Sequence, residues 1–169
     1  MMILVTGGSK CGKSRYAESL FAKRTEPKYY IATMQPYGKE AHEAIDRHRK
    51  MRKEKGFMTV EQYTDIDCAE MQSGGVVLLE CMGNLLANEM FRGETVIDCT
   101  DKIISDVMRL HQKTKMLVIV TNQVGSDGIC YENGTASYIA ALGKINQAVA
   151  FQADCVIECV YGIPVTVKG

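Results

Sequence analysis

The sequence predicts an α/β fold in which a mainly parallel, doubly wound sheet carries helices on both faces. Short apolar runs typical of buried strands alternate along the chain with longer stretches whose apolar residues recur at helical spacing. A glycine-rich segment lies between the first apolar run and the first helical stretch. Pro164 opens the last apolar segment, a position that suits an edge strand. We therefore expect the sheet to end in one antiparallel strand at the carboxyl terminus.

Each element is assigned from its own pattern of apolar residues. Gly56 and the Gly74-Gly75 pair mark turns between elements, and 124–133 is expected to be a long functional loop. The predicted strands are 3–5, 29–33, 57–61, 76–80, 116–120, 155–161 and 165–168. The predicted helices are about 13–23, 39–55, 65–71, 85–91, 96–113 and 135–152.

Composition limits the kind of protein this is. A chain of 169 residues is expected to form one domain, 1–169, and 46% apolar with 24% charged residues is ordinary for a soluble globular protein. A net charge of zero argues against a broad nucleic-acid surface, and no apolar run approaches the ~18 residues of a membrane span. Seven cysteines without C-x-x-C spacing indicate neither zinc nor a disulfide framework, so we expect a cytoplasmic protein.

A phosphate-binding loop is the strongest motif in the chain. Residues 7–14 fit G-x-x-x-x-G-K-[ST], directly after a predicted strand and before a predicted helix. Glycines let backbone N–H groups surround an anion, Lys13 can reach the outer phosphates, and the Ser14 hydroxyl can hold Mg²⁺. The alternative is a glycine-rich turn with an incidental Lys-Ser pair. It does not explain why the motif lies between a predicted strand and a predicted helix. The fold is therefore predicted to be P-loop NTPase-like, with a nucleoside triphosphate bound by Gly7, Gly8, Ser9, Lys10, Cys11, Gly12, Lys13 and Ser14.

Two further strands end in polar residues at the same predicted edge of the sheet. The apolar strand 76–80 closes on Glu80, the arrangement of a Walker B segment with Glu in place of the commoner Asp. Such a carboxylate can hold Mg²⁺, directly or through water, or accept a proton. Alternatively, Glu80 caps the next helix. Thr33 begins a polar loop after strand 29–33, at the carboxyl edge where ligands of open α/β sheets bind.

His48 lies on the apolar stripe of the predicted helix 39–55, among many cations. On residues alone two interpretations stay open: the histidine packs inward on a solvated helix, or it faces phosphates within an electropositive collar. Arg52 lies four residues later and hence one helical turn away.

Taken together, several segments resemble one family. ILVTGGSKCGKSRYAE, YIATMQ, AIDRHRKMR, TVE, LLECMGNLLANEMF, VIVTNQVG and GKINQAVAFQAD are similar, in order and spacing, to the bifunctional adenosylcobinamide kinase / adenosylcobinamide-phosphate guanylyltransferase of cobalamin biosynthesis. The resemblance implies two reactions. A nucleoside triphosphate phosphorylates adenosylcobinamide, and GMP from GTP is then transferred through a GMP–histidine intermediate to adenosylcobinamide phosphate, giving adenosylcobinamide-GDP. It also implies a homotrimer that uses GTP, ATP and Mg²⁺.

The resemblance also implies roles for single residues. His48 matches the guanylylated histidine, with Lys13 and Glu80 as further catalytic residues and Ser14 and Glu80 as the metal site. Neutral imidazole is a competent nucleophile near pH 7, and neighbouring cations offset charge on the phosphates. The remaining nucleotide contacts are expected at Ala32, Thr33, Met34, Arg49, Lys50, Met51, Arg52, Glu61 and Glu80. Glu61 is our choice for reading the guanine N–H groups.

Some positions differ from the family pattern. Gln123 stands where the family usually has Glu, and Ser137 and Ala141 stand where it has Arg and Asp. The absence of these charged side chains affects what can be expected of the kinase reaction or of the contacts to the corrinoid. The phosphate-binding loop and His48 are retained. Two other functions therefore stay open: a P-loop small-molecule kinase in which His48 only steadies phosphates, or a nucleotide-binding regulator without guanylyl transfer.

Overall fold

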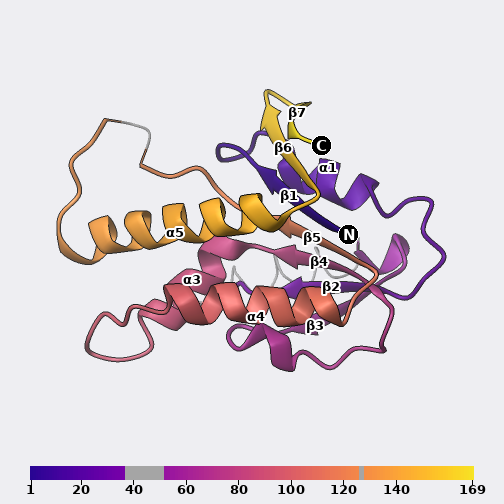
Figure 1. The fold of residues 1–169 in the computed structure, drawn as a ribbon, viewed down its shortest axis with the longest axis horizontal. Coiled ribbons are helices and arrows are strands. Elements are labelled where there is room, and N and C mark those ends of the chain that lie inside the picture. Colours follow the sequence, from indigo (N-terminus) through magenta and orange to yellow (C-terminus); the bar gives the residue numbers. More distant parts are fainter. Residues whose placement is uncertain (37–51, 126–127) are drawn as a thin grey trace.

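Seven apolar runs form the strands of one sheet in the computed structural model, which describes residues 1–36, 52–125 and 128–169. The strand order is β3-β2-β4-β5-β1-β6-β7 (Figure 1). All neighbouring pairs are parallel except β6 and β7, so the predicted antiparallel edge strand is confirmed. The strands are β1 (Met2–Thr6), β2 (Lys28–Ala32), β3 (Phe57–Glu61), β4 (Val76–Glu80), β5 (Met116–Val120), β6 (Cys155–Val160) and β7 (Ile163–Lys168).

Helices cover both faces of the sheet. Helix α1 (Lys13–Ser19) lies on one face, and α3 (Met82–Met90), α4 (Thr100–Gln112) and α5 (Asn133–Gln152) pack on the other (Figure 1). Strand residues alternate between the two cores, because successive side chains point to opposite faces. In β2, Tyr29 belongs to the core with α3–α5, whereas Tyr30 belongs to the core with α1.

Several elements begin or end away from their predicted limits, for local reasons. Helix α3 begins at Met82 rather than near 85 because the Cys81 sulfur accepts a hydrogen bond from the N–H of Asn84, an unusual cap. Helix α4 begins at Thr100 rather than near 96 because the Asp98 carboxylate accepts from the N–H of Thr100 and turns the chain there. The predicted helix 65–71 is only the 3₁₀ turn η1 (Ile66–Cys68).

Other differences are small. Helix α1 ends at Ser19 and is followed by turns instead of continuing to about 23. Strand β7 begins at Ile163, so that Pro164 lies within this edge strand rather than before it. Most of the predicted helix 39–55 lies outside the described residues. None of the helices in the described part of the chain has the length and apolar character needed to span a membrane.

The register of the strands brings their carboxyl ends into one row. Ala32 pairs with Glu61 on one side and with Glu80 on the other. Glu80 pairs in turn with Val120, which pairs with Val5 two residues before the glycine loop. The sequence-predicted residues at the ends of β1, β2, β3 and β4 therefore share one edge of the sheet.

Candidate functional site: a phosphate-binding loop and its carboxylate

At two positions of the loop between β1 and α1, the backbone conformation and the surrounding atoms leave little room for a side chain. Gly7 has φ 146°, and a Cβ there would lie 2.7 Å from both the Cys11 sulfur and the Cys159 carbonyl oxygen. Gly12 has φ 93° and lies just before α1, where a Cβ would approach Cα of Gly162 to 3.2 Å. The loop is thus shaped by its glycines and packed against the turn between β6 and β7.

The loop is also tied to its surroundings by hydrogen bonds. The N–H of Gly162 donates to the Cys11 carbonyl at 2.9 Å, and the N–H of Gln123 donates to the Gly7 carbonyl at 3.2 Å. The Lys13 ammonium donates to the Gly8 carbonyl at 2.8 Å, and the residue is 8% exposed. A lysine held against a glycine-rich loop at the start of a helix is an arrangement that attracts phosphate groups.

Glu80 at the end of β4 connects the loop to the neighbouring strands. One carboxylate oxygen accepts a hydrogen bond from the Ser14 hydroxyl, and the other accepts from the Tyr30 hydroxyl at 2.9 Å. The sequence predicted the Ser14–Glu80 pair as a metal site, and the structure brings the two side chains into contact. A serine hydroxyl beside a carboxylate offers the oxygen ligands that Mg²⁺ prefers.

Thr33 is fully buried and fixes the end of β2 against that of β4. Its hydroxyl donates to the Cys81 carbonyl at 2.9 Å and accepts from the N–H of Cys81 at 2.8 Å. Burial raises the pKa of the Cys81 thiol. The Thr33 hydroxyl is thereby engaged within the protein, and the nucleotide contact expected at this residue stays a prediction.

A cavity of about 390 Å³ opens beside this carboxylate, within the size range of small-molecule sites. It brings together six sequence-predicted residues: Ser14, Ala32, Met34, Arg52, Glu61 and Glu80. It also contains residues that sequence reasoning missed: Arg15, Glu18, Tyr30, Lys55, Thr59, Cys81 and Asn84. Arg15 and Lys55 could have been predicted from the sequence, because each is a cation close in sequence to a predicted site residue.

Arg52 is buried in this cavity, with 7% of its surface exposed. Its guanidinium carbon lies 3.9 Å from the centre of the Tyr30 ring, in cation–π geometry. The other predicted residues of the same segment, His48, Arg49, Lys50 and Met51, lie outside the described residues.

The three positions that differ from the family pattern lie in different surroundings. The Gln123 side chain donates to the Glu158 carboxylate at 2.8 Å, beside the glycine loop. Ala141 is 7% exposed and belongs to the core between the sheet and α3–α5. Ser137 borders a separate hollow with Asp98 and Lys144. Only Gln123 is therefore next to the phosphate-binding loop.

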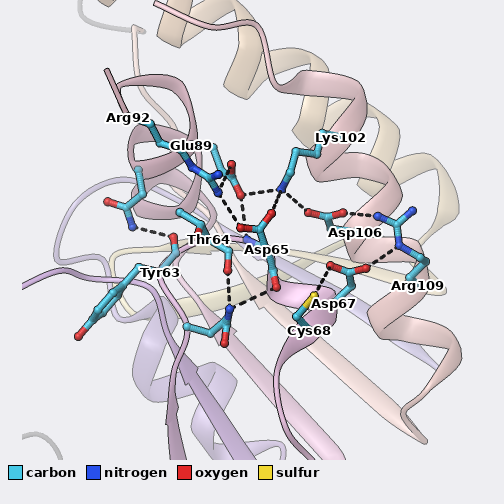
Figure 2. A network of polar contacts seen from close by, with 12 residues as sticks. Tyr63, Thr64, Asp65, Asp67, Cys68, Glu89, Arg92, Lys102, Asp106 and Arg109 are labelled. Atoms are coloured by element: carbon cyan, nitrogen blue, oxygen red, sulfur yellow. Dashed lines mark hydrogen bonds and ion pairs between the residues drawn. The ribbon is translucent and has the colours of Figure 1, made fainter. Parts of the chain in front are cut away.

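A network of charged residues joins the chain around Asp65 to helices α3 and α4 (Figure 2). Asp65, Glu89 and Asp106 place carboxylate oxygens within 4.8 Å of one another, as in a metal site. The Lys102 ammonium lies between them, 2.7 Å from Asp65 and Glu89 and 2.8 Å from Asp106. Lys102, together with Arg92 on Glu89 and Arg109 on Asp106, therefore compensates the charge of these carboxylates, and we assign the cluster a structural role.

Comparison with known proteins finds one family over almost the whole chain. The model of the family described as cobinamide kinase / cobinamide phosphate guanyltransferase matches residues 3–167. The bifunctional adenosylcobalamin biosynthesis protein CobU of Escherichia coli K12 is 35% identical over 184 residues, covering 99% of this chain and 100% of that protein. The Salmonella typhimurium protein of the same name is 34% identical, again over 99% and 100% of the two chains.

A more distant relative and one solved structure complete the comparison. The bifunctional adenosylcobalamin biosynthesis protein CobP of Pseudomonas aeruginosa is 26% identical over 100% of this chain and 98% of its own. A structure of an ATPase from the type III secretion system superposes with a TM-score of 0.55 at 13% identity, over 98% of this chain and 56% of that one. At that identity the likeness concerns the fold alone, which is that of P-loop NTPases.

Proposed function

The chain belongs to the cobinamide kinase / cobinamide phosphate guanyltransferase family, and from this membership we propose that it carries out both reactions on adenosylcobinamide. In the first reaction a nucleoside triphosphate, ATP or GTP, phosphorylates the corrinoid hydroxyl. In the second, GMP from GTP is transferred to adenosylcobinamide phosphate, which gives adenosylcobinamide-GDP.

In the kinase reaction, the acceptor hydroxyl oxygen attacks the γ-phosphorus and its proton passes to solvent. The bond to the β-phosphate oxygen breaks and releases the nucleoside diphosphate. The backbone amides of residues 7–14 and the Lys13 ammonium hold and neutralise the phosphates. Glu80 and Ser14 have the oxygen donors to hold Mg²⁺, which would spread the negative charge of the phosphates.

In the guanylyl transfer, a neutral imidazole nitrogen of His48 attacks the α-phosphorus of GTP, and pyrophosphate leaves. A phosphate oxygen of adenosylcobinamide phosphate then attacks the phosphorus of the GMP–histidine, and the imidazole is released. We assign the further nucleotide contacts, with Glu61 facing the guanine, to Ala32, Thr33, Met34, Arg49, Lys50, Met51, Arg52 and Glu61.

The observation that carries the proposal is a continuous series of contacts from the loop to Arg52. Ser14 donates to Glu80, Tyr30 donates to the same carboxylate, and Arg52 stacks on the Tyr30 ring. Arg52 follows His48 by four residues, a length of chain that spans at most about 14 Å. His48 itself lies outside the described residues, and its role as nucleophile is proposed from the resemblance.

Mass spectrometry after incubation with GTP and Mg²⁺ tests the proposal. We expect one GMP per chain, attached at His48, stable to alkali and lost in acid. The His48→Asn protein should bind GTP without forming the adduct. A wild-type protein that phosphorylates adenosylcobinamide without any GMP adduct would instead be the simple P-loop kinase, and one that does neither would be a nucleotide-binding regulator.

We further propose that the chain assembles as a homotrimer in the cytoplasm, as expected from the resemblance. Support comes from strand β7 at the edge of the sheet, whose side chains Ile163 and Val167 are 66% and 63% exposed. An apolar edge strand of this kind is usually covered in a stable protein. Light scattering coupled to size-exclusion chromatography tests the assembly, and a monomer at micromolar concentration would contradict it.

A further inference from the structure

Tyr30 makes two different contacts within the candidate site. Its hydroxyl donates to one oxygen of Glu80 at 2.9 Å, while the other oxygen of Glu80 accepts from Ser14. Both oxygens of the carboxylate are therefore held, one by the phosphate-binding loop and one by the tyrosine. Fixed hydrogen bonds of this kind orient a ligand group before the metal or substrate arrives.

The face of the same ring carries the Arg52 guanidinium, 3.9 Å from the ring centre. Tyr30 and Arg52 are only 8% and 7% exposed, so this contact is shielded from water. Cation–π contacts are stronger when water is excluded. One side chain thus contacts a carboxylate through its hydroxyl and a guanidinium through its ring.

From this arrangement we propose that Tyr30 is a positioning residue, which orients Glu80 toward Ser14 and holds Arg52 over the cavity that binds a magnesium–nucleoside triphosphate. The proposal rests on the function proposed above and deepens it. It assigns no bond-making step to Tyr30, which acts through Glu80 and Arg52.

If Tyr30 had only a structural role, replacing it should affect the protein no differently from replacing another buried tyrosine. Tyr29 provides this comparison. Tyr29 is the preceding residue of β2, is 5% exposed, and faces the opposite core. Its hydroxyl accepts a hydrogen bond from the N–H of Gln72 at 3.1 Å, away from the cavity. Replacing either tyrosine by phenylalanine removes one buried hydroxyl, but only Tyr30→Phe frees Glu80.

The test compares Tyr30→Phe with Tyr29→Phe. For each protein, guanylylation and corrinoid phosphorylation are followed over a range of Mg²⁺ concentrations, alongside unfolding in urea. We expect Tyr30→Phe to lower kcat, or to raise the Mg²⁺ concentration at half-maximal rate, by about tenfold, the scale of one hydrogen bond to a charged group. Tyr29→Phe should leave both quantities unchanged. Equal kinetics for the two variants would overturn the proposal.

Two further variants separate the contacts. Adding Tyr30→Phe to Glu80→Gln should cause no additional loss, because the group that Tyr30 orients is already altered. Tyr30→Leu, which also removes the ring, should raise KM for GTP beyond the value for Tyr30→Phe, since Arg52 loses its support. Additive losses in the first case would count against the proposal.

Failure of the proposed function is distinguishable from failure of this inference. If the wild-type protein catalyses neither reaction, binding of a fluorescent GTP analogue at increasing Mg²⁺ still reports on Glu80. Under the inference, Tyr30→Phe requires about tenfold more Mg²⁺ in that assay and Tyr29→Phe does not. For a protein that catalyses neither reaction, equal Mg²⁺ dependence of the two variants would refute the role of Tyr30.

Discussion

The Asn88 side chain of α3 donates to the backbone carbonyl of Thr33 at 2.7 Å, just beyond the end of β2. The same amide nitrogen donates to the carbonyl of Tyr63 at 2.9 Å, just beyond the end of β3. The Asn88 side chain therefore connects helix α3 to two segments that border the candidate site. One segment follows β2 and the other follows β3. Neither carbonyl belongs to a strand ladder, so both depend on a donor from elsewhere.

Replacing Asn88 should loosen this junction. Asn88→Ala leaves two carbonyls without this donor, and we expect a loss of about 1–3 kcal/mol in the free energy of unfolding. Asn88→Asp keeps the size of the side chain but places a carboxylate against both carbonyls, so it should be destabilised at least as much. Urea denaturation measures both. An Asn88→Asp protein as stable as the wild type would contradict the assignment of the amide as a donor.

The fold was largely predictable because its signals are local. Apolar runs such as 76–80 and 116–120 are too short for helices and have no polar face, which is typical of strands buried in a parallel sheet. The glycine loop was predictable for the same reason, since its glycines, Lys13 and Ser14 are contiguous. The start of α3 was not, because its cap is the sulfur of Cys81 rather than one of the usual oxygen-bearing residues.

The parts of the site that sequence reasoning missed depend on tertiary contacts. Tyr30 has the pattern of an ordinary strand residue, and its partner Glu80 is fifty positions away. Asn88 likewise resembles any polar residue of an amphipathic helix. Lys102 and the carboxylates of Asp65 and Glu89 come from three different segments, so no sequence spacing reveals their cluster.

Lys102 should be needed for stability at neutral pH. Glu89 and Asp106 expose only 2% and 3% of their side chains, and Lys102 is the cation that pairs with both (Figure 2). Lys102→Met removes this shared cation, so that Glu89 keeps only its pair with Arg92 and Asp106 only its pair with Arg109. We expect a loss of roughly 2–4 kcal/mol, below the largest values for buried pairs because the lysine itself is partly exposed. Lys115→Met, on an exposed lysine 3.8 Å from Glu26, is the control and should change stability by less than about 0.5 kcal/mol.

The same variant should alter the dependence of stability on pH. Hydrogen bonds from Lys102, and then from Arg92, lower the pKa of Asp65 to about 2. A lowered carboxyl pKa stabilises the wild-type fold above the unfolded value of about 4, and this contribution is lost as the pH falls toward 2. Without Lys102 the pKa of Asp65 should be lowered less, so the mutant has less of this stability to lose. The stability difference between wild type and Lys102→Met should therefore narrow as the pH falls from about 5 toward 2, and a constant difference would contradict this explanation.

Gly12 and Gly8 should respond differently to alanine, although both belong to the phosphate-binding loop. Gly12 has φ 93°, and a Cβ there would lie 3.2 Å from Cα of Gly162. Gly12→Ala should therefore lower the free energy of unfolding by about 1–3 kcal/mol and also weaken nucleotide binding. At Gly8 no atom lies within 4 Å of an added Cβ. Gly8→Ala should therefore leave the free energy of unfolding unchanged. A loss of GTP affinity in this variant, measured by titration calorimetry, would then come from crowding of the bound phosphates by the added methyl group.

Cys11 should make the site sensitive to alkylation. It lies in the phosphate-binding loop and is partly exposed, whereas Cys159 beside it is buried. A maleimide attached to Cys11 would fill space that bound phosphates need, because the loop encloses them closely. We expect N-ethylmaleimide to abolish GTP binding, and Mg²⁺ with GTP to protect Cys11 from the reagent. Peptide mass spectrometry measures the modification at each cysteine.

The chain contains its own control for this experiment, since Cys68 and Cys130 are exposed outside the loop and should be alkylated equally with and without nucleotide. Cys11→Ser keeps a small side chain at the position, so it should bind GTP like the wild type and resist inactivation by the reagent. If Cys11 reacts equally with and without GTP, the nucleotide does not cover the loop. If the fully alkylated protein still binds GTP normally, the phosphates do not lie against residues 7–14, and the site would have to be assigned elsewhere in the chain.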